Sequence, residues 1–450
     1  MAFITPILSD LILDTPPNYH PDTFVKLPNM PKAFSMIDLF AGCGGLSLGF
    51  EQEGFRPLLF SEINLNAAQT YMQNRRGEGV IPFGDIYSLT NDNLRLFKEN
   101  WALEGIEDID LIAGGPPCQG YNGIGHRRSF KLDKEEIPSN HLFLEMVRVV
   151  EFLRPKVFLF ENVKGLLSGR WTKEGEKGEI FKDVLAAFKN IEGYECGWDL
   201  LYAKDYGVPQ NRPRTIIVGY RQDVLDNYRR PALRIEEASS PYSAGGDAKH
   251  KGFLPESLDQ EAPSLQDLLS DLIDPDYLKV HETDKYPEKI SNSIQRYLRS
   301  TPEGKVMGKG SRLTEHEYSK HSDKVVEKFK YMLKHNGKIA ESMKTKKFAQ
   351  RLLPKTWNGS GPNITATSLP DDYVHFKQPR VPTVREWARI QTFPDWYQFA
   401  GPRTTGGRRR AGDPDAGLWE REVPKYTQIG NAVPVLLAKN IAAHIKEIIA

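Results

Sequence analysis

The sequence predicts an α/β protein, with a doubly wound, mostly parallel sheet and a second, smaller domain of mixed structure. Three observations lead to this fold class. Between Phe34 and Tyr220, short apolar runs alternate with amphipathic segments, a pattern typical of a parallel sheet with helices on both faces. After Tyr220 the alternation stops, and Lys, Asp, Ser, Gly and Pro become frequent. The chain has 450 residues, which is enough for two or three domains of about 150 residues each.

The expected elements follow in order along the chain. Residues 1–33 hold six prolines and little periodicity, so we expect an extended N-terminal arm. The doubly wound domain is expected over residues 34–220, the mixed domain over 221–375 and a C-terminal segment over 376–450. The final stretch, 433–448, has one apolar face and should return as a helix to the core of the first domain. Another clear helix is 140–153, and the expected strands are 35–40, 57–61, 80–83, 109–113, 157–160, 195–203 and 215–220.

Composition excludes several classes of protein. Hydrophobic residues make up 39% of the chain and charged residues 26%, which fits a folded, soluble protein. No apolar stretch approaches the roughly 18 residues that span a bilayer, and the first lysine is Lys26, so we expect neither a membrane protein nor a signal peptide. Three cysteines (Cys43, Cys118 and Cys196) are too few for a disulfide framework and indicate a reducing, cytoplasmic location. No His/Cys pair has ligand spacing, so no metal site is expected.

Charge is unevenly distributed, although the net charge is only +1. Residues 301–355 hold 14 Lys/Arg against 6 Asp/Glu, whereas residues 253–290 hold 3 against 10. The basic stretch could face phosphates. From charge alone, a solvated helical surface is the simpler interpretation.

A glycine loop follows the first expected strand. Residues 38–45 read Asp-Leu-Phe-Ala-Gly-Cys-Gly-Gly, and glycines there let a ligand approach the backbone closely. Glu62 ends the second strand 20 residues after Gly42, where an acidic side chain reaches ribose hydroxyls. Asp85 follows the third strand and could accept a hydrogen bond from an adenine amine. The pattern favours an adenosyl ligand, with ordinary surface capping as the alternative. The loop lacks the full G-x-G-x-x-G spacing, which disfavours a dinucleotide.

A thiol lies at the tip of the fourth expected strand. Cys118 follows the rigid sequence Gly-Gly-Pro-Pro, at the sheet edge where parallel α/β proteins bind ligands. To act as a nucleophile it must be a thiolate, which a free thiol of pKa about 8.5 reaches only partly at neutral pH. Cys43 and Cys196 are instead expected to be buried.

Charged side chains are expected at the same edge. Glu161 directly follows four apolar residues, so its carboxylate should be partly desolvated and could carry a proton. A helix-capping role is the alternative. Arg212 and Arg214 are at alternate positions before a later strand and could hold a substrate oxygen or support Glu161. A surface ion pair would explain them equally well.

Taken together, these segments resemble the DNA cytosine-5 methyltransferase family. The resemblance covers about residues 34–220 and again about 362–450, and Pro-Pro-Cys-Gln, Glu-Asn-Val and Gly-Asn-Ala-Val-Pro together are highly specific. Residues 221–361 match nothing that can be aligned, as expected for the variable target-recognition region of the family. Tyr121-Asn122 depart from the family's usual Phe-Ser. The matching segments are 38–45, 62, 84–86, 115–119, 161–163, 210–214, 380–394 and 428–434.

The resemblance implies a role for each matching residue. Cys118 would add to C6 of cytosine, Glu161 would contact N3 and the exocyclic amine, and Arg212 and Arg214 would support the flipped base. The implied fold is that of S-adenosylmethionine-dependent methyltransferases. The implied S-adenosylmethionine site consists of Phe40, Gly42, Gly44, Gly45, Glu62, Ile63, Asp85, Ile86, Pro116, Asn431 and Val433. The implied DNA contacts are Gln119, Arg127, Arg128 and Thr365.

The expected function is that of a sequence-specific DNA (cytosine-5-)-methyltransferase. It would transfer a methyl group from S-adenosylmethionine to C5 of a cytosine that leaves the duplex, through a covalent adduct with Cys118. The expected partners are duplex DNA and, in a restriction-modification system, a restriction endonuclease acting on the same site; we expect a monomer. Two alternatives stay open: the same chemistry on tRNA, and a catalytically silent, methyltransferase-like DNA-binding protein. A nicotinamide oxidoreductase is a more distant one.

Overall fold

The computed structural model describes residues 33–77, 79–117, 138–172, 174–228, 246–344, 350–356, 361–364, 372–404 and 422–450. Its centre is a seven-stranded sheet in the order β3-β2-β1-β4-β5-β7-β6. The strands β3, β2, β1, β4 and β5 are parallel to one another. Strand β7 is antiparallel to both β5 and β6. Each strand lies within three residues of its predicted position, which confirms the fold class. The strands are β1 (Phe34–Leu39), β2 (Phe55–Ser61), β3 (Ile81–Phe83), β4 (Leu111–Gly114), β5 (Val157–Val163), β6 (Tyr194–Tyr202) and β7 (Pro213–Arg221).

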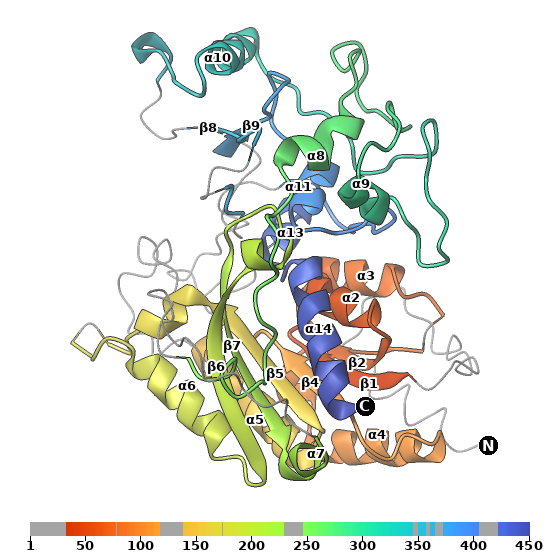
Figure 1. The fold of residues 1–450 in the computed structure, drawn as a ribbon, viewed down its shortest axis with the longest axis vertical. Helices are drawn as coiled ribbons and strands as arrows, with labels where there is room; N and C mark the ends of the chain where they lie inside the picture. Colours follow the sequence, from red (N-terminus) through yellow and green to blue (C-terminus); the bar gives the residue numbers. More distant parts are fainter. Residues whose placement is uncertain are drawn as a thin grey trace.

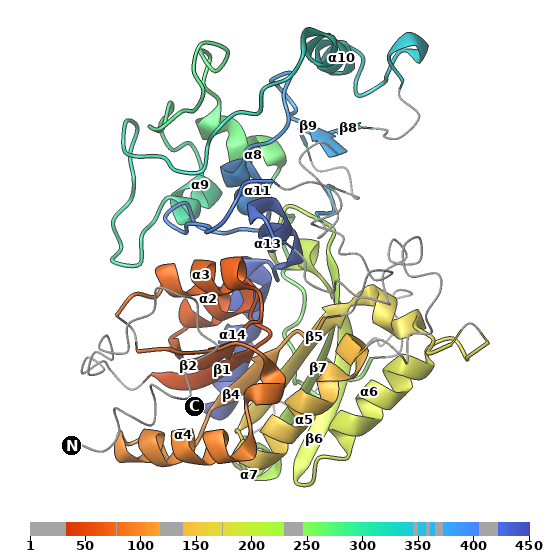
Figure 2. The same cartoon turned by 180° about the vertical axis from the view of Figure 1, so that it is seen from behind.

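Helices cover both faces of this sheet, because successive strand residues are apolar on both sides. Met36 of β1 packs in one core with α2 (Gly45–Glu51), α7 (Gln222–Asn227) and α14 (Val435–Ile449). Its neighbour Ile37 packs in the opposite core with α4 (Asn91–Leu103), α5 (Leu142–Leu153) and α6 (Glu179–Lys189). Figure 1 shows α14 in front of the sheet, and Figure 2 shows α4, α5 and α6 on the other face. Cys196 is buried in the second core, as predicted.

The last helix returns to the first part of the chain, as the sequence predicts. The helix packs against α2 at Gly49, and the segment just before it packs against Gly45, one helical turn earlier in α2. A Cβ on Gly45 would lie 2.5 Å from the carbonyl oxygen of Val433, and a Cβ on Gly49 would overlap Ala438. Only glycine therefore allows α2 and α14 to approach so closely.

A second group of elements lies at one end of the sheet (Figure 1). It contains α8 (Leu265–Leu269), α9 (Ser293–Leu298), α10 (Asp323–Lys334), α11 (Val384–Ile390) and the short parallel strands β8 (Arg351–Leu352) and β9 (Tyr373–Val374). The helix α13 (Lys425–Asn431) lies between this group and the sheet. Among the described residues, no helix is both long and apolar enough to cross a membrane.

Buried ion pairs join early and late residues of this second group. Arg389 of α11 is fully buried and pairs with Asp271 at 2.5 Å and with Asp395 at 2.6 Å. Arg299 pairs with the same Asp271 at 3.1 Å. Removing one member of such a network leaves an uncompensated buried charge, so these pairs tie residues 271–299 firmly to residues 389–395.

Candidate active site and cofactor site

The predicted site lies at the edge of the sheet where the parallel strands end. Strands β1 and β4 are neighbours, but the chain continues from β1 toward β2 and from β4 toward β5, on opposite sides. Such a switch point leaves a crevice outside the carboxyl ends of the two strands. The glycine loop leaves β1 here, and the Gly-Gly-Pro-Pro turn leaves β4 here.

The glycine loop has an unusual backbone path that opens it toward a ligand. Phe40, Gly42 and Gly44 have φ angles of 58°, 57° and 81°, in the left-handed region. A Cβ built on Gly42 would meet no other heavy atom of the described residues within 4 Å, so space lies above the loop. A non-glycine residue such as Phe40 rarely adopts this conformation, and such strain is concentrated at functional sites.

Glu62 lies against this loop. Its Oε2 accepts a hydrogen bond from the backbone N–H of Gly42 at 2.9 Å, and its Oε1 accepts one from Asn64 at 2.7 Å. Burial raises the pKa of Glu62 above its ordinary value. The next side chain, Ile63, is 72% exposed. A carboxylate and an exposed apolar surface therefore lie side by side in sequence next to the loop, as an adenosyl group requires.

The third strand brings Asp85 to the same edge. Its Oδ1 accepts a hydrogen bond from the backbone N–H of Tyr87 at 3.1 Å, which begins a short 3-10 turn. The turn directs Ile86 into the core, where it is 4% exposed, whereas Tyr87 is 52% exposed. The cofactor role of Ile86 stays a prediction, and the exposed ring of Tyr87 is a further candidate that was not predicted from the sequence. The aromatic side chain two positions after Asp85 was the available signal.

The C-terminal motif, residues 428–434, contacts the glycine loop although it lies near the other end of the chain. The Cys43 thiol, which is buried as predicted, donates to the carbonyl of Gln428 at 3.4 Å. The carbonyl of Val433 lies against Gly45, and Asn431 is exposed at the end of α13. Burial raises the pKa of Cys43 to about 12, so its thiol stays protonated. The two predicted halves of the cofactor site therefore meet, although 385 residues separate Cys43 from Gln428.

Glu161 forms an ion pair with Arg214 at the end of β5. The two residues are diagonal neighbours on antiparallel strands, since Glu161 pairs with Ile216 in the β5–β7 register. Their side chains are 12% and 7% exposed. A Cβ on Gly115 would lie 2.8 Å from Oε2 of Glu161, so the turn after β4 packs directly on this carboxylate. The site thus holds a mostly buried, oriented carboxylate.

The amide of Asn162 anchors the same turn. Its Nδ2 donates to the carbonyl oxygen of Pro116 at 3.2 Å, and its side chain is buried. Pro116 therefore has a fixed position beside β5. The chain is described up to Pro117, directly before the predicted nucleophile.

Arg212 has different partners from Arg214. It is 2% exposed, and it donates to the carbonyl oxygens of Gly430 at 2.7 Å and Asn431 at 3.2 Å, and also to that of Ile364. It therefore connects the C-terminal motif with the end of the second group of elements.

A family model for C-5 cytosine-specific DNA methylases matches residues 34–447. The chain belongs to this family. The Type II methyltransferase M.DdeI of Desulfomicrobium norvegicum is 34% identical over 426 residues, which cover 91% of this chain and 88% of that protein. The Type II methyltransferase M.XorII of Xanthomonas oryzae pv. oryzae is 31% identical over 413 residues, covering 91% and 84%. A candidate DNA modification methyltransferase encoded within a prophage (E. coli) has a crystal structure with the same fold: its TM-score is 0.61 at 22% identity, covering 92% of this chain and 99% of that one.

This methyltransferase acts on DNA and uses S-adenosylmethionine as its methyl donor. The residues at the sheet edge suit that molecule. The space above Gly42 admits a ligand close to the backbone, and the Glu62 carboxylate can accept hydrogen bonds from a ribose. Ile63 and Tyr87 expose apolar surface for a flat base.

Five predicted residues lie outside the described part of the methyltransferase. They are Cys118, Gln119, Arg127, Arg128 and Thr365. Their roles stay predictions.

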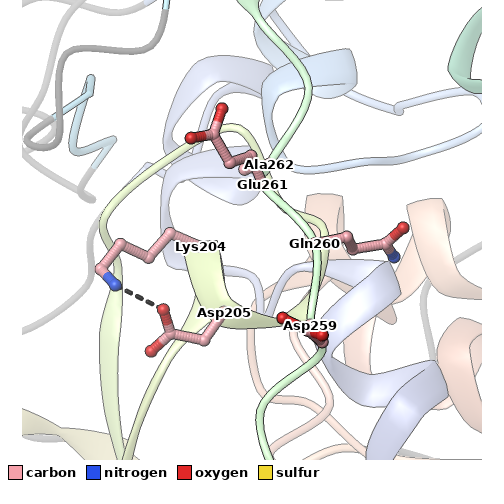
Figure 3. A pocket seen from close by; sticks show the side chains of 6 residues that line it. All are labelled: Lys204, Asp205, Asp259, Gln260, Glu261 and Ala262. Carbon is pink, nitrogen blue, oxygen red and sulfur yellow. Dashed lines mark hydrogen bonds and ion pairs between the residues drawn. The ribbon is translucent and has the colours of Figure 1, made fainter.

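A hollow of about 400 Å³ lies elsewhere, between residues 204–205 and residues 259–262 (Figure 3). Asp205 pairs there with Lys204, while Asp259 and Glu261 add further negative charge. None of the predicted site residues lines it. Its acidic lining repels phosphate, so we do not expect DNA to bind there.

Proposed function

We propose that this methyltransferase modifies cytosine within a specific sequence of duplex DNA, through a covalent adduct between Cys118 and C6 of a flipped base. One observation supports the proposal most strongly: the mostly buried carboxylate of Glu161 is paired with Arg214 and packs on Gly115 of the turn that leads to Cys118. A carboxyl group so oriented can hydrogen-bond the N3 side of cytosine.

The thiolate of Cys118 would form a bond to C6 while N3 gains a proton from the carboxyl group of Glu161, which makes C5 a nucleophilic enamine carbon. S-adenosylmethionine would supply an electrophilic methyl group to C5, with breakage of its sulfonium S–CH3 bond, and would leave as S-adenosylhomocysteine. Loss of the C5 proton to solvent water, return of the N3 proton to Glu161 and departure of the Cys118 thiolate from C6 would then restore the aromatic ring. Glu161 holds the base at N3 and at its exocyclic amine, and Arg214 fixes the position of Glu161.

The remaining parts of the chain would recognise DNA. In this proposal residues 34–220 catalyse, residues 221–375 recognise the target, residues 376–450 complete the cofactor site, and residues 1–33 form an arm. The basic stretch 301–355 would contact phosphates. Because the curated relatives are named Type II methyltransferases, we propose a cognate restriction endonuclease as a functional partner. The protein would act as a cytoplasmic monomer.

Transfer of a labelled methyl group tests this proposal. The full chain is incubated with labelled S-adenosylmethionine and either mixed duplex DNA or tRNA. We expect label in DNA only, with loss of transfer but unchanged S-adenosylhomocysteine binding in Cys118→Ser. Unchanged transfer by that variant would remove Cys118 from the mechanism, and label in tRNA alone would favour the RNA alternative.

A further inference from the structure

Three side chains pack beneath the glycine loop. A Cβ on Gly44 would lie 2.9 Å from an atom of each of Tyr71, Arg75 and Tyr397. Tyr71 lies on α3 (Leu65–Gln73), Arg75 follows that helix, and Tyr397 comes from a segment more than 300 residues away. We call these three residues the loop cradle. Gly44 is thus required both by its φ angle and by this close contact.

The loop cradle binds two successive carbonyl groups of the loop. The Tyr397 hydroxyl donates to the carbonyl of Cys43 at 2.6 Å, and Arg75 Nη2 donates to that of Gly44 at 3.4 Å. Arg75 Nη1 also donates to the Tyr397 hydroxyl at 3.1 Å. In a trans peptide the N–H points opposite to the C=O. The N–H of Gly45, which shares a peptide with the Gly44 carbonyl, therefore points away from the cradle.

Arg75 is itself held in one orientation. Its side chain is 1% exposed, and its guanidinium binds both oxygens of Glu51, at 2.5 and 2.7 Å. It also stacks over the ring of Tyr71 at 3.8 Å. A planar guanidinium with this many fixed partners can hold a loop in a single conformation. A lysine ammonium cannot reproduce the fixed planar arrangement of several N–H donors.

We propose that Arg75, acting with Tyr397, is a positioning residue that sets the affinity of the glycine loop for the cofactor without touching it. The proposal depends on residues 38–45 being the cofactor loop, as the proposed function assumes. A preformed loop binds its ligand tightly because the loop has already lost its conformational entropy on folding and loses little more on binding. Loss of Arg75 should therefore weaken cofactor binding and leave the transfer step intact.

Calorimetry with S-adenosylhomocysteine on the full chain tests this. We expect Arg75→Met to weaken binding by about 10- to 100-fold, since an arginine held by several partners is lost, and to raise the KM for S-adenosylmethionine similarly. The kcat at saturating cofactor and the KM for DNA should stay within about twofold, because no reacting group is changed. Arg75→Lys should give an intermediate loss of affinity.

Arg221→Met is the matched control. Arg221 is a similarly paired arginine, bound to Asp108 at 2.9 Å and Asp223 at 2.7 Å, and it ends β7, away from the loop. Its loss should lower thermal stability but leave S-adenosylhomocysteine affinity within about twofold.

A second variant keeps the test decisive if Arg75→Met does not fold. Tyr397→Phe retains the ring but removes the hydrogen bond to Cys43, and about 3- to 10-fold weaker binding is expected. Unchanged S-adenosylhomocysteine affinity in the folded variants would overturn the positioning role while leaving the proposed function standing. A wild-type chain that binds no S-adenosylhomocysteine would instead contradict the cofactor site itself.

Discussion

Asp38, near the end of β1 and shortly before the glycines of the loop, should make the stability of this methyltransferase depend on pH. The side chain is 1% exposed, and burial raises the pKa of its carboxyl from 3.8 to about 7, although hydrogen bonding from Ser47 and the charge of Arg75 oppose the rise. The negative charges of nearby Glu51 and Glu62 raise the pKa of Asp38 further. Between about pH 4 and pH 7 the folded state therefore holds a proton that the unfolded state has lost, so the free energy of unfolding falls as pH rises through this window.

The magnitude follows from the two pKa values. At about 1.4 kcal/mol per pH unit, the full effect above pH 7 is about 4 kcal/mol, of which about 2 to 3 kcal/mol develops between pH 5 and pH 8. The variant Asp38→Asn is neutral at every pH and retains an oxygen that can accept from Ser47.

Urea denaturation of the wild type and Asp38→Asn at pH 5, 6.5 and 8 measures this effect directly. Taking the difference between the two proteins at each pH cancels the titration of the groups that do not interact with Asp38. The stability of the variant relative to the wild type should rise toward high pH by about 2 to 3 kcal/mol. A difference that stays constant from pH 5 to pH 8 would refute the reasoning.

Three further outcomes are expected. Gly49→Ala places a Cβ against Ala438 and forces α2 and α14 apart, so thermal denaturation should show a loss of about 1 to 3 kcal/mol; an unchanged melting temperature would contradict the packing. Burial lowers the pKa of His375 to about 3, so the folded state excludes a proton below the ordinary pKa of 6.5, and stability should fall as pH drops. In His375→Asn, the fall in the free energy of unfolding between pH 7 and pH 5, measured by urea denaturation, should be smaller than in the wild type. Arg214→Lys removes the Nε–H group that contacts Glu161, so kcat should fall by about 10- to 100-fold with S-adenosylhomocysteine affinity unchanged, and equal kcat values would exclude the orienting role.

The sheet was predictable because its signals are local. Each strand is a short apolar run, and burial on both faces imposes that pattern directly, as at Val157 and Phe158, which pack in opposite cores. The link between the glycine loop and Glu62 followed from the carboxyl ends of neighbouring strands lying at one edge.

Other features carry no local signal. The partners of Arg212 lie 152 to 219 residues away in sequence, so nothing near Arg212 indicates them. Tyr397 likewise reaches the carbonyl of Cys43 across 354 residues. The exposure of Tyr87 depends on a single 3-10 turn, whose phase no periodicity over three residues can fix.

Base-resolution mapping of 5-methylcytosine, in DNA from a host expressing this chain, tests the central claim most directly. A host expressing Cys118→Ser serves as the comparison. We predict methylation of one cytosine within a single recognised sequence in the first host and none above background in the second. Absence of 5-methylcytosine in the first host, or the same pattern in both, would contradict the claim.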